Sequence, residues 1–144
     1  MEKELNAEIY NQILELSEVG NALADQDDFR AARTKFEEAL ALLPEPKTDW
    51  EAALWLYASM GDMDFLSGRY TEAAEALSRA LNCEDGATNP FVRLRLGQSL
   101  FEQGMHGEAT EHLLRAYMLE GSEIFESEDP KYFHYLKTNV KDIN

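Results

Sequence analysis

Cysteine occurs only once in the sequence, at Cys83, so the chain cannot form an internal disulfide. A disulfide-held scaffold is therefore excluded, and a single thiol fits a reducing compartment. Long apolar runs are also missing, because the longest, AALWLYASM at 52–60, is far shorter than the roughly 20 residues that a membrane span needs. The start of the chain, MEKELNAEIY, is acidic and does not resemble a secretory signal. We therefore expect a cytoplasmic protein.

Basic residues are scarce, with 13 Lys and Arg against 28 Asp and Glu and a net charge of −15. The excess of acid lies mainly in the first two thirds of the chain. Such a field repels nucleic acids and anionic membranes and attracts basic proteins. Surface acids also keep a protein soluble without any role in binding, so both interpretations stay open.

Signatures of catalysis are missing as well. The sequence has no GxSxG motif, phosphate-binding loop or dinucleotide fingerprint. His106 and His112 are not spaced to share one helical face, and His134 is far from both, so no metal site is expected. The acidic neighbours of Cys83 should raise the pKa of its thiol and make it a poor nucleophile. We predict no enzyme activity, no cofactor and no metal, with an enzyme only a remote alternative.

The sequence does contain a repeated spacing of small residues. In GDMDFLSGRYTEAAEALSRAL (61–81), a glycine is followed at fixed offsets by two alanines with a large residue between them, and the same offsets occur twice more. Glycine fills only 8 of 144 positions, so three glycines in one register indicate a real repeat. The aligned sets are Gly20, Ala32, Phe36 and Ala39; Gly61, Ala73, Leu77 and Ala80; and Gly97, Ala109, Leu113 and Ala116.

This spacing predicts a pair of antiparallel helices in each copy. The Gly and Ala positions would lie where the two backbones approach most closely, and the large residue would fill the space beside them. One such hairpin cannot bury its apolar face alone, so neighbouring copies must stack to form a continuous core.

The pattern resembles the tetratricopeptide repeat, whose units carry glycine and two alanines in this register and often end in a proline, as at Pro44. The resemblance implies an all-α fold, a right-handed α-solenoid of three helix hairpins with a C-terminal capping helix. The copies are spaced more widely than the family period of about 34 residues, and the extra residues should lie in loops at 44–50 and 82–90. We expect one domain, 1–144, with repeats at about 13–46, 54–87 and 90–121 and a cap at 122–144.

Local signals mark several helix ends. Thr48–Glu51 has the pattern of a capping box at the start of a helix over 49–66, and Asn89–Pro90 predicts an N-cap before a first-turn proline. Gly121 is a natural helix stop, and Asp129–Pro130 should begin the terminal helix.

The helix over 49–66 is apolar on more than one side, although a core-facing helix needs only one apolar face. In the tetratricopeptide family the first helix of each repeat lines a concave groove, so the resemblance implies a groove that is aromatic in the middle and acidic around it. Alternatively, the first helix or the terminal cap buries its aromatic residues. The matching positions are Leu14, Ser17, Asn21, Ala24 and Asp25; Trp55, Ala58, Asp62, Phe65 and Leu66; and Phe91, Leu94, Gln98, Phe101 and Glu102.

Some members of the family hold the C-terminal carboxylate of a peptide with Lys, Asn and Arg in this groove. Asn21 matches one of those positions and Arg95 lies near another, but Ser17 and Ala58 stand where the lysine is required. An acidic peptide tail is therefore disfavoured, and electrostatics favour a basic partner.

We therefore predict a protein-binding module for a basic or amphipathic segment, a monomer or weak dimer without affinity for nucleic acid or membranes. The aromatic groove residues would anchor the partner, and the acidic ones would steer it. The predicted contact residues are Asn21, Asp25, Trp55, Asp62, Phe65, Leu66, Arg95, Gln98, Phe101 and Glu102.

The C-terminal stretch EIFESEDPKYFHYLK resembles the end of small bacterial repeat proteins found beside polymorphic toxins. This resemblance implies an immunity protein that masks a basic toxin. The alternative is a chaperone for a secreted protein, because the three-repeat chaperones of type III secretion are similar in size and acidity. Their characteristic sequence stretches are not evident here.

The register makes a prediction about stability that is independent of function. Ala73→Leu should overpack the helix crossing and lower the free energy of unfolding by about 1–3 kcal/mol. A thermal unfolding midpoint equal to that of the parent chain would count against the register.

Overall fold

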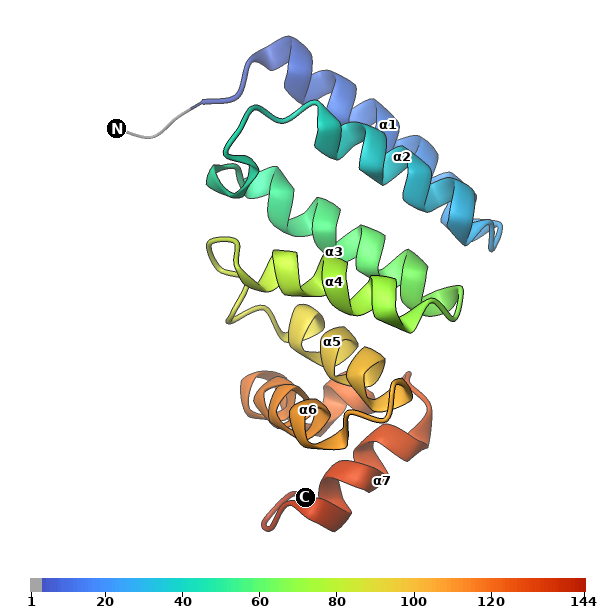
Figure 1. The fold of residues 1–144 in the computed structure, drawn as a ribbon, viewed down its shortest axis with the longest axis vertical. Coiled ribbons are helices and arrows are strands. Elements are labelled where there is room, and N and C mark those ends of the chain that lie inside the picture. The colour runs from blue at the N-terminus through green and yellow to red at the C-terminus, as the bar shows by residue number, and fades with distance from the viewer. Residues whose placement is uncertain (1–3) are drawn as a thin grey trace.

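The computed structural model describes residues 4–144, which form helices and loops without any strand. Figure 1 shows helix hairpins stacked one behind the next, with the last helix at the far end from the first. This arrangement confirms the predicted all-α solenoid. The hairpins are α1 (Ala7–Asp25) with α2 (Phe29–Ala41), α3 (Glu51–Leu66) with α4 (Tyr70–Leu81), and α5 (Pro90–Glu102) with α6 (His106–Glu120). Two short 3-10 helices, η1 (Lys47–Asp49) and η2 (Gly121–Phe125), precede α3 and α7 (Pro130–Asn139).

The repeated small residues lie where the two helices of each hairpin meet. A Cβ added to Gly61 would lie 2.5 Å from Cγ of Leu77, so only glycine lets α3 and α4 approach this closely. The aligned alanines are all fully buried in the same crossings. Each glycine contacts the large residue of its own hairpin: Gly20 against Phe36, Gly61 against Leu77, and Gly97 against Leu113.

The loop before α3 differs from the prediction. Lys47–Asp49 form a 3-10 turn and the backbone of Trp50 is extended, so α3 begins at Glu51 with no side-chain cap, and the capping box at Thr48–Glu51 is wrong. The loop is held in other ways. The Trp50 indole donates to the Pro44 carbonyl at 2.8 Å, and Lys47 Nζ donates to the Leu43 carbonyl at 2.9 Å.

The other predicted helix ends are confirmed. The Asn89 side chain accepts a hydrogen bond from the backbone N–H of Val92 at 3.1 Å, and Asp129 accepts from that of Lys131 at 3.0 Å. Gly121 ends α6 with φ of 76°, a conformation that favours glycine. No helix in the described part of the chain is both long and apolar enough to cross a membrane.

A partly buried polar contact joins α5 to α6. The Arg93 guanidinium donates to the Ala87 carbonyl at 2.9 Å, and its Nη1 lies 3.0 Å from Nδ1 of His112. Burial lowers the pKa of His112, and the Arg93 charge lowers it further. The neutral imidazole, accepting at Nδ1, is therefore the form that stabilises this contact.

Gly61→Ala should lower the free energy of unfolding by about 1–3 kcal/mol, because Leu77 has to move to admit the methyl group. Gly107→Ala is a matched control, since a Cβ on this helical residue meets nothing within 4 Å and alanine favours helix by up to about 1 kcal/mol. Urea unfolding of the two variants measures both effects. Equal stability of the two would contradict a close approach at Gly61.

The His112 contact predicts a pH dependence of stability. Because the folded pKa is below the unfolded value of about 6.5, the unfolded chain binds the proton more readily, and stability should fall as the pH drops below about 6.5. His112→Gln keeps an acceptor for Arg93 but does not titrate, so it should flatten the change in urea midpoint between about pH 7.5 and pH 5.5. An undiminished change in the variant would show that other groups cause it.

Candidate protein-binding site

By helical spacing, the predicted groove residues share one side of each of α1, α3 and α5, which we call the inner face. The chain itself covers the α5 part of this face. After α6 the chain turns back at Gly121, and residues 121–136, which we call the return segment, pack against α5 and α6. Phe125, Tyr132 and Leu136 of the return segment are buried there, in one apolar cluster with Leu94.

A charged cluster holds the return segment on α5. Glu128 Oε1 accepts hydrogen bonds from Arg95 Nη1 at 2.6 Å and from Gln98 Nε2 at 2.8 Å. Arg95 Nη1 also donates to Gln98 Oε1 at 2.7 Å, and Arg95 Nε donates to Asp62 Oδ1 on α3 at 2.9 Å. Two carboxylates therefore share one guanidinium. Gln98 is fully buried and Arg95 nearly so.

Aromatic rings surround this cluster. The Arg95 guanidinium lies 4.7 Å from the ring centre of Phe65 and 5.1 Å from that of Phe91, within the range of cation–π attraction. Burial raises the pKa of Asp62, and the nearby Glu128 charge raises it further while Arg95 lowers it.

The return segment also contacts the end of α5. The ring of Phe101 lies 5.4 Å from that of Tyr132 and 5.2 Å from that of Tyr135. Glu102 accepts a hydrogen bond from the Tyr132 hydroxyl at 2.9 Å and forms an ion pair with Lys131 at 2.8 Å. The predicted contact residues Arg95, Gln98, Phe101 and Glu102 are thus brought together, but with the chain's own C-terminal part.

The remaining predicted contact residues line the α1 and α3 part of the inner face. Asn21 and Asp25 on α1 are exposed, and Leu66 at the end of α3 is 44% exposed. Trp55 is partly buried and packs against the main core. The apolar contacts of the return segment are with α5 and α6 and with Phe65 near the end of α3, whereas Asn21, Asp25 and Leu66 stay exposed.

A cavity of about 410 Å³ lies at the N-terminal ends of α1 and α3. Its walls include Leu5, Tyr10 and Trp50, with Glu4 and Glu51 beside them. Because residues four apart share a helix face, Tyr10 continues the row of Leu14 on α1, and Glu51 continues that of Trp55 on α3. The cavity is therefore an extension of the inner face, which begins one turn earlier on each helix than the predicted groove positions.

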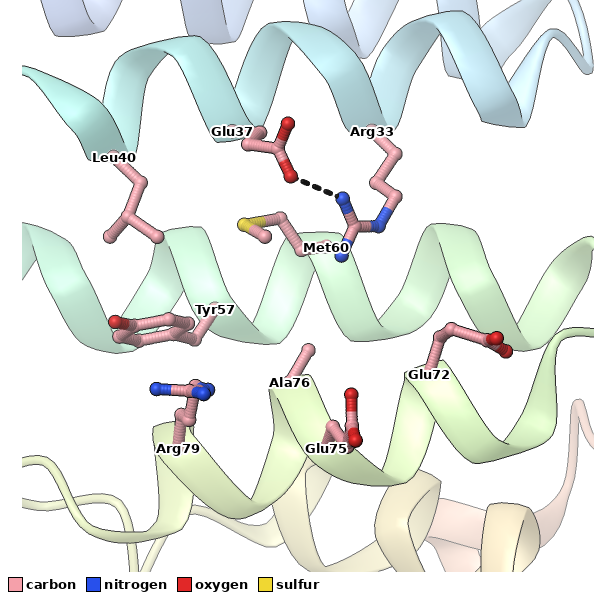
Figure 2. Close-up of a pocket in the computed structure, with 9 residues that line it drawn as sticks. All are labelled: Arg33, Glu37, Leu40, Tyr57, Met60, Glu72, Glu75, Ala76 and Arg79. Carbon is pink, nitrogen blue, oxygen red and sulfur yellow. Dashed lines mark hydrogen bonds and ion pairs between the residues drawn. The ribbon is translucent and has the colours of Figure 1, made fainter.

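A second cleft, of about 310 Å³, lies on the opposite face of α3, between α2 and α4 (Figure 2). Tyr57 and Met60 form its floor, and its walls carry both signs of charge. The Arg33 guanidinium donates to Glu37 at 2.7 Å and to the buried Asp64 at 2.9 Å. Burial raises the pKa of Asp64, and the Arg33 charge offsets part of this rise. This mixed charge differs from the cavity at the start of the inner face, where none of the described lining residues is basic.

The sequence did not predict the roles of two of these residues, Glu128 and Asp64. Glu128 is one of several acids in EIFESEDP, and no sequence signal distinguishes it from its neighbours. Asp64 could have been noticed, because it is an acid between Met63 and Phe65 in an apolar helix, and such an acid needs a buried partner.

The surroundings of Cys83 and His106, which were candidates for chemistry, indicate structural roles. Cys83 is buried, and it is burial that raises the pKa of its thiol. His106 stacks on Phe101 with ring centres 4.7 Å apart. Within residues 4–144, no three His, Cys, Asp or Glu side chains are grouped so that they could hold a metal ion.

Stacked hairpins that share one helix-crossing register define an α-solenoid, a class of protein-interaction module. The chain belongs to the tetratricopeptide repeat family, because the sequence model of that family matches residues 8–83, more than half of the chain. Among solved structures, the fold is similar to the N-terminal domain of stress-induced protein-1 (STI-1) from C. elegans, with a TM-score of 0.68 and 16% sequence identity. That match covers 93% of this chain and 98% of the other. No curated protein matches the sequence.

Proposed function

We propose that this chain is a non-enzymatic module that binds a basic, amphipathic segment of another protein along the α1 and α3 part of the inner face. The observation that supports this proposal is the cavity at the start of the inner face, which has apolar and aromatic walls. None of the described residues that line it is basic, and two are glutamates.

The inner face combines what a protein-binding surface needs. Tyr10, Trp50 and Trp55 provide large apolar area with little rotamer entropy to lose, and aromatic residues carry much of the binding energy at interfaces. Asp25 and Asp62 add negative charge farther along the same face. Acidic groups there would speed the approach of a basic segment and orient it.

The specific role that we propose is neutralisation of a basic bacterial toxin. A net charge of −15 would speed capture of a basic protein, and a segment held on the inner face would be withdrawn from its own target. A chaperone for a secreted protein would use the same surface. The genes beside this one distinguish the two roles, because a large toxin gene supports neutralisation and a translocator operon supports the chaperone.

Trp55→Ala should weaken binding of a fluorescein-labelled lysine–leucine amphipathic peptide by about tenfold or more, because it removes an aromatic anchor. Fluorescence anisotropy of the labelled peptide measures the affinity, and thermal unfolding checks that the variant is folded. Unchanged affinity in a folded Trp55→Ala variant would place the peptide elsewhere on the protein.

Charge reversal provides a matched comparison between the two faces. Asp25→Lys should weaken binding of the same peptide and reduce the salt dependence of that binding, because the lost charge lies on the inner face. Glu75→Lys makes an equal change of charge at the cleft of Figure 2 and should have a much smaller effect. Equal losses in the two variants would mean that only the overall charge of the protein matters.

A further inference from the structure

Arg95 is a strong cation on the described part of the inner face, and the chain's own Glu128 is already bound to it. Glu128 Oε1 accepts from Arg95 at 2.6 Å and from Gln98 at 2.8 Å, so the carboxylate occupies a site built of two donors. Gln98 is fully buried, and Arg95 is 8% exposed. An incoming carboxylate could reach these donors only by displacing Glu128.

Displacement of Glu128 by an incoming carboxylate is unfavourable. Glu128 belongs to the same chain, so its local concentration at Arg95 is high compared with that of any dissolved competitor. Phe125 and Tyr132, on either side of Glu128 in the return segment, are buried against α5 and hold it in place. Removing Glu128 from Arg95 would also disturb these apolar contacts.

The cluster as a whole is negative. Asp62 and Glu128 each carry one negative charge against the single positive charge of Arg95. The side chains of Asp62 and Glu128 are 24% and 16% exposed, whereas that of Arg95 is 10% exposed. A segment on the inner face therefore meets the two carboxylates more readily than the guanidinium.

We propose that Glu128 determines the charge preference of the inner face, excluding acidic segments by occupying Arg95 and leaving a negative cluster that favours basic ones. This inference rests on the proposed function for its basic partner, but the exclusion of acidic segments can be tested separately. Glu128 is thus a specificity-determining residue supplied by the return segment.

The test uses the full chain and two labelled synthetic peptides of equal length and apolar pattern, one of lysine and leucine and one of glutamate and leucine. Glu128→Gln should bind the glutamate peptide at least about tenfold more tightly than the parent chain, because Arg95 loses its competing charge. Glu126→Gln is the matched control, since it removes one exposed charge from the same segment but not from Arg95. It should change the affinity no more than about twofold.

Two outcomes would overturn the proposal. The first is a Glu128→Gln variant that binds the glutamate peptide no more tightly than the parent chain does. The second is an equal gain in affinity in Glu126→Gln, which would make overall charge the cause. Hydrogen exchange of the α7 amides shows whether the return segment stays docked in each variant. Should Glu128→Gln not fold, the double variant R95Q/E128Q removes Arg95 together with Glu128 and leaves Asp62 as the acid of the cluster. This variant must still reject the glutamate peptide, and binding of that peptide would refute the proposal.

The same data separate this inference from the proposed function. If the parent chain does not bind the lysine peptide, the proposed function is wrong. The effect of Glu128 is judged from the glutamate peptide alone, through the difference between Glu128→Gln and Glu126→Gln. A gain restricted to Glu128→Gln would support the role of Glu128 even in that case.

Discussion

The architecture depends on the close approach of two helix backbones in each hairpin. Gly61 permits that approach because Leu77 occupies the space that a Cβ would need, and the corresponding glycines of the other hairpins are placed in the same way. Interiors are packed almost as densely as organic crystals, so one added methyl group at such a point is felt by both helices. The spacing of the hairpins, and hence the shape of the inner face, follows from this contact.

The middle helix α3 links the hairpins electrostatically as well as by packing. Its Asp64 pairs with Arg33 of the preceding hairpin, and its Asp62 pairs with Arg95 of the following one. The two acids are two residues apart and pair with the hairpins on opposite sides of α3. Partly buried pairs of this kind add little net stability but penalise any register that leaves a charge unpaired. They favour one arrangement of the stack over slipped alternatives.

The repeat could be predicted from the sequence because glycine is rare and its register with the alanines is strict. The starts of α5 and α7 were also predictable, since Asn89 and Asp129 each precede a proline and cap the helix locally. The start of α3 was not, because the turn at Lys47–Asp49 is held by contacts of Trp50 and Lys47 with the preceding loop. Pairings such as Arg95 with Glu128 join residues far apart in the chain, and no local pattern encodes them.

The return segment has a consequence for self-association. Helical stacks of this kind can extend when the last hairpin of one molecule packs on the first hairpin of the next, and such head-to-tail contacts build open filaments wherever the rotation does not close a ring. Phe125, Tyr132 and Leu136 cover the last hairpin, so that surface is not available to another molecule. Head-to-tail stacking on that surface would therefore require the return segment to leave it first.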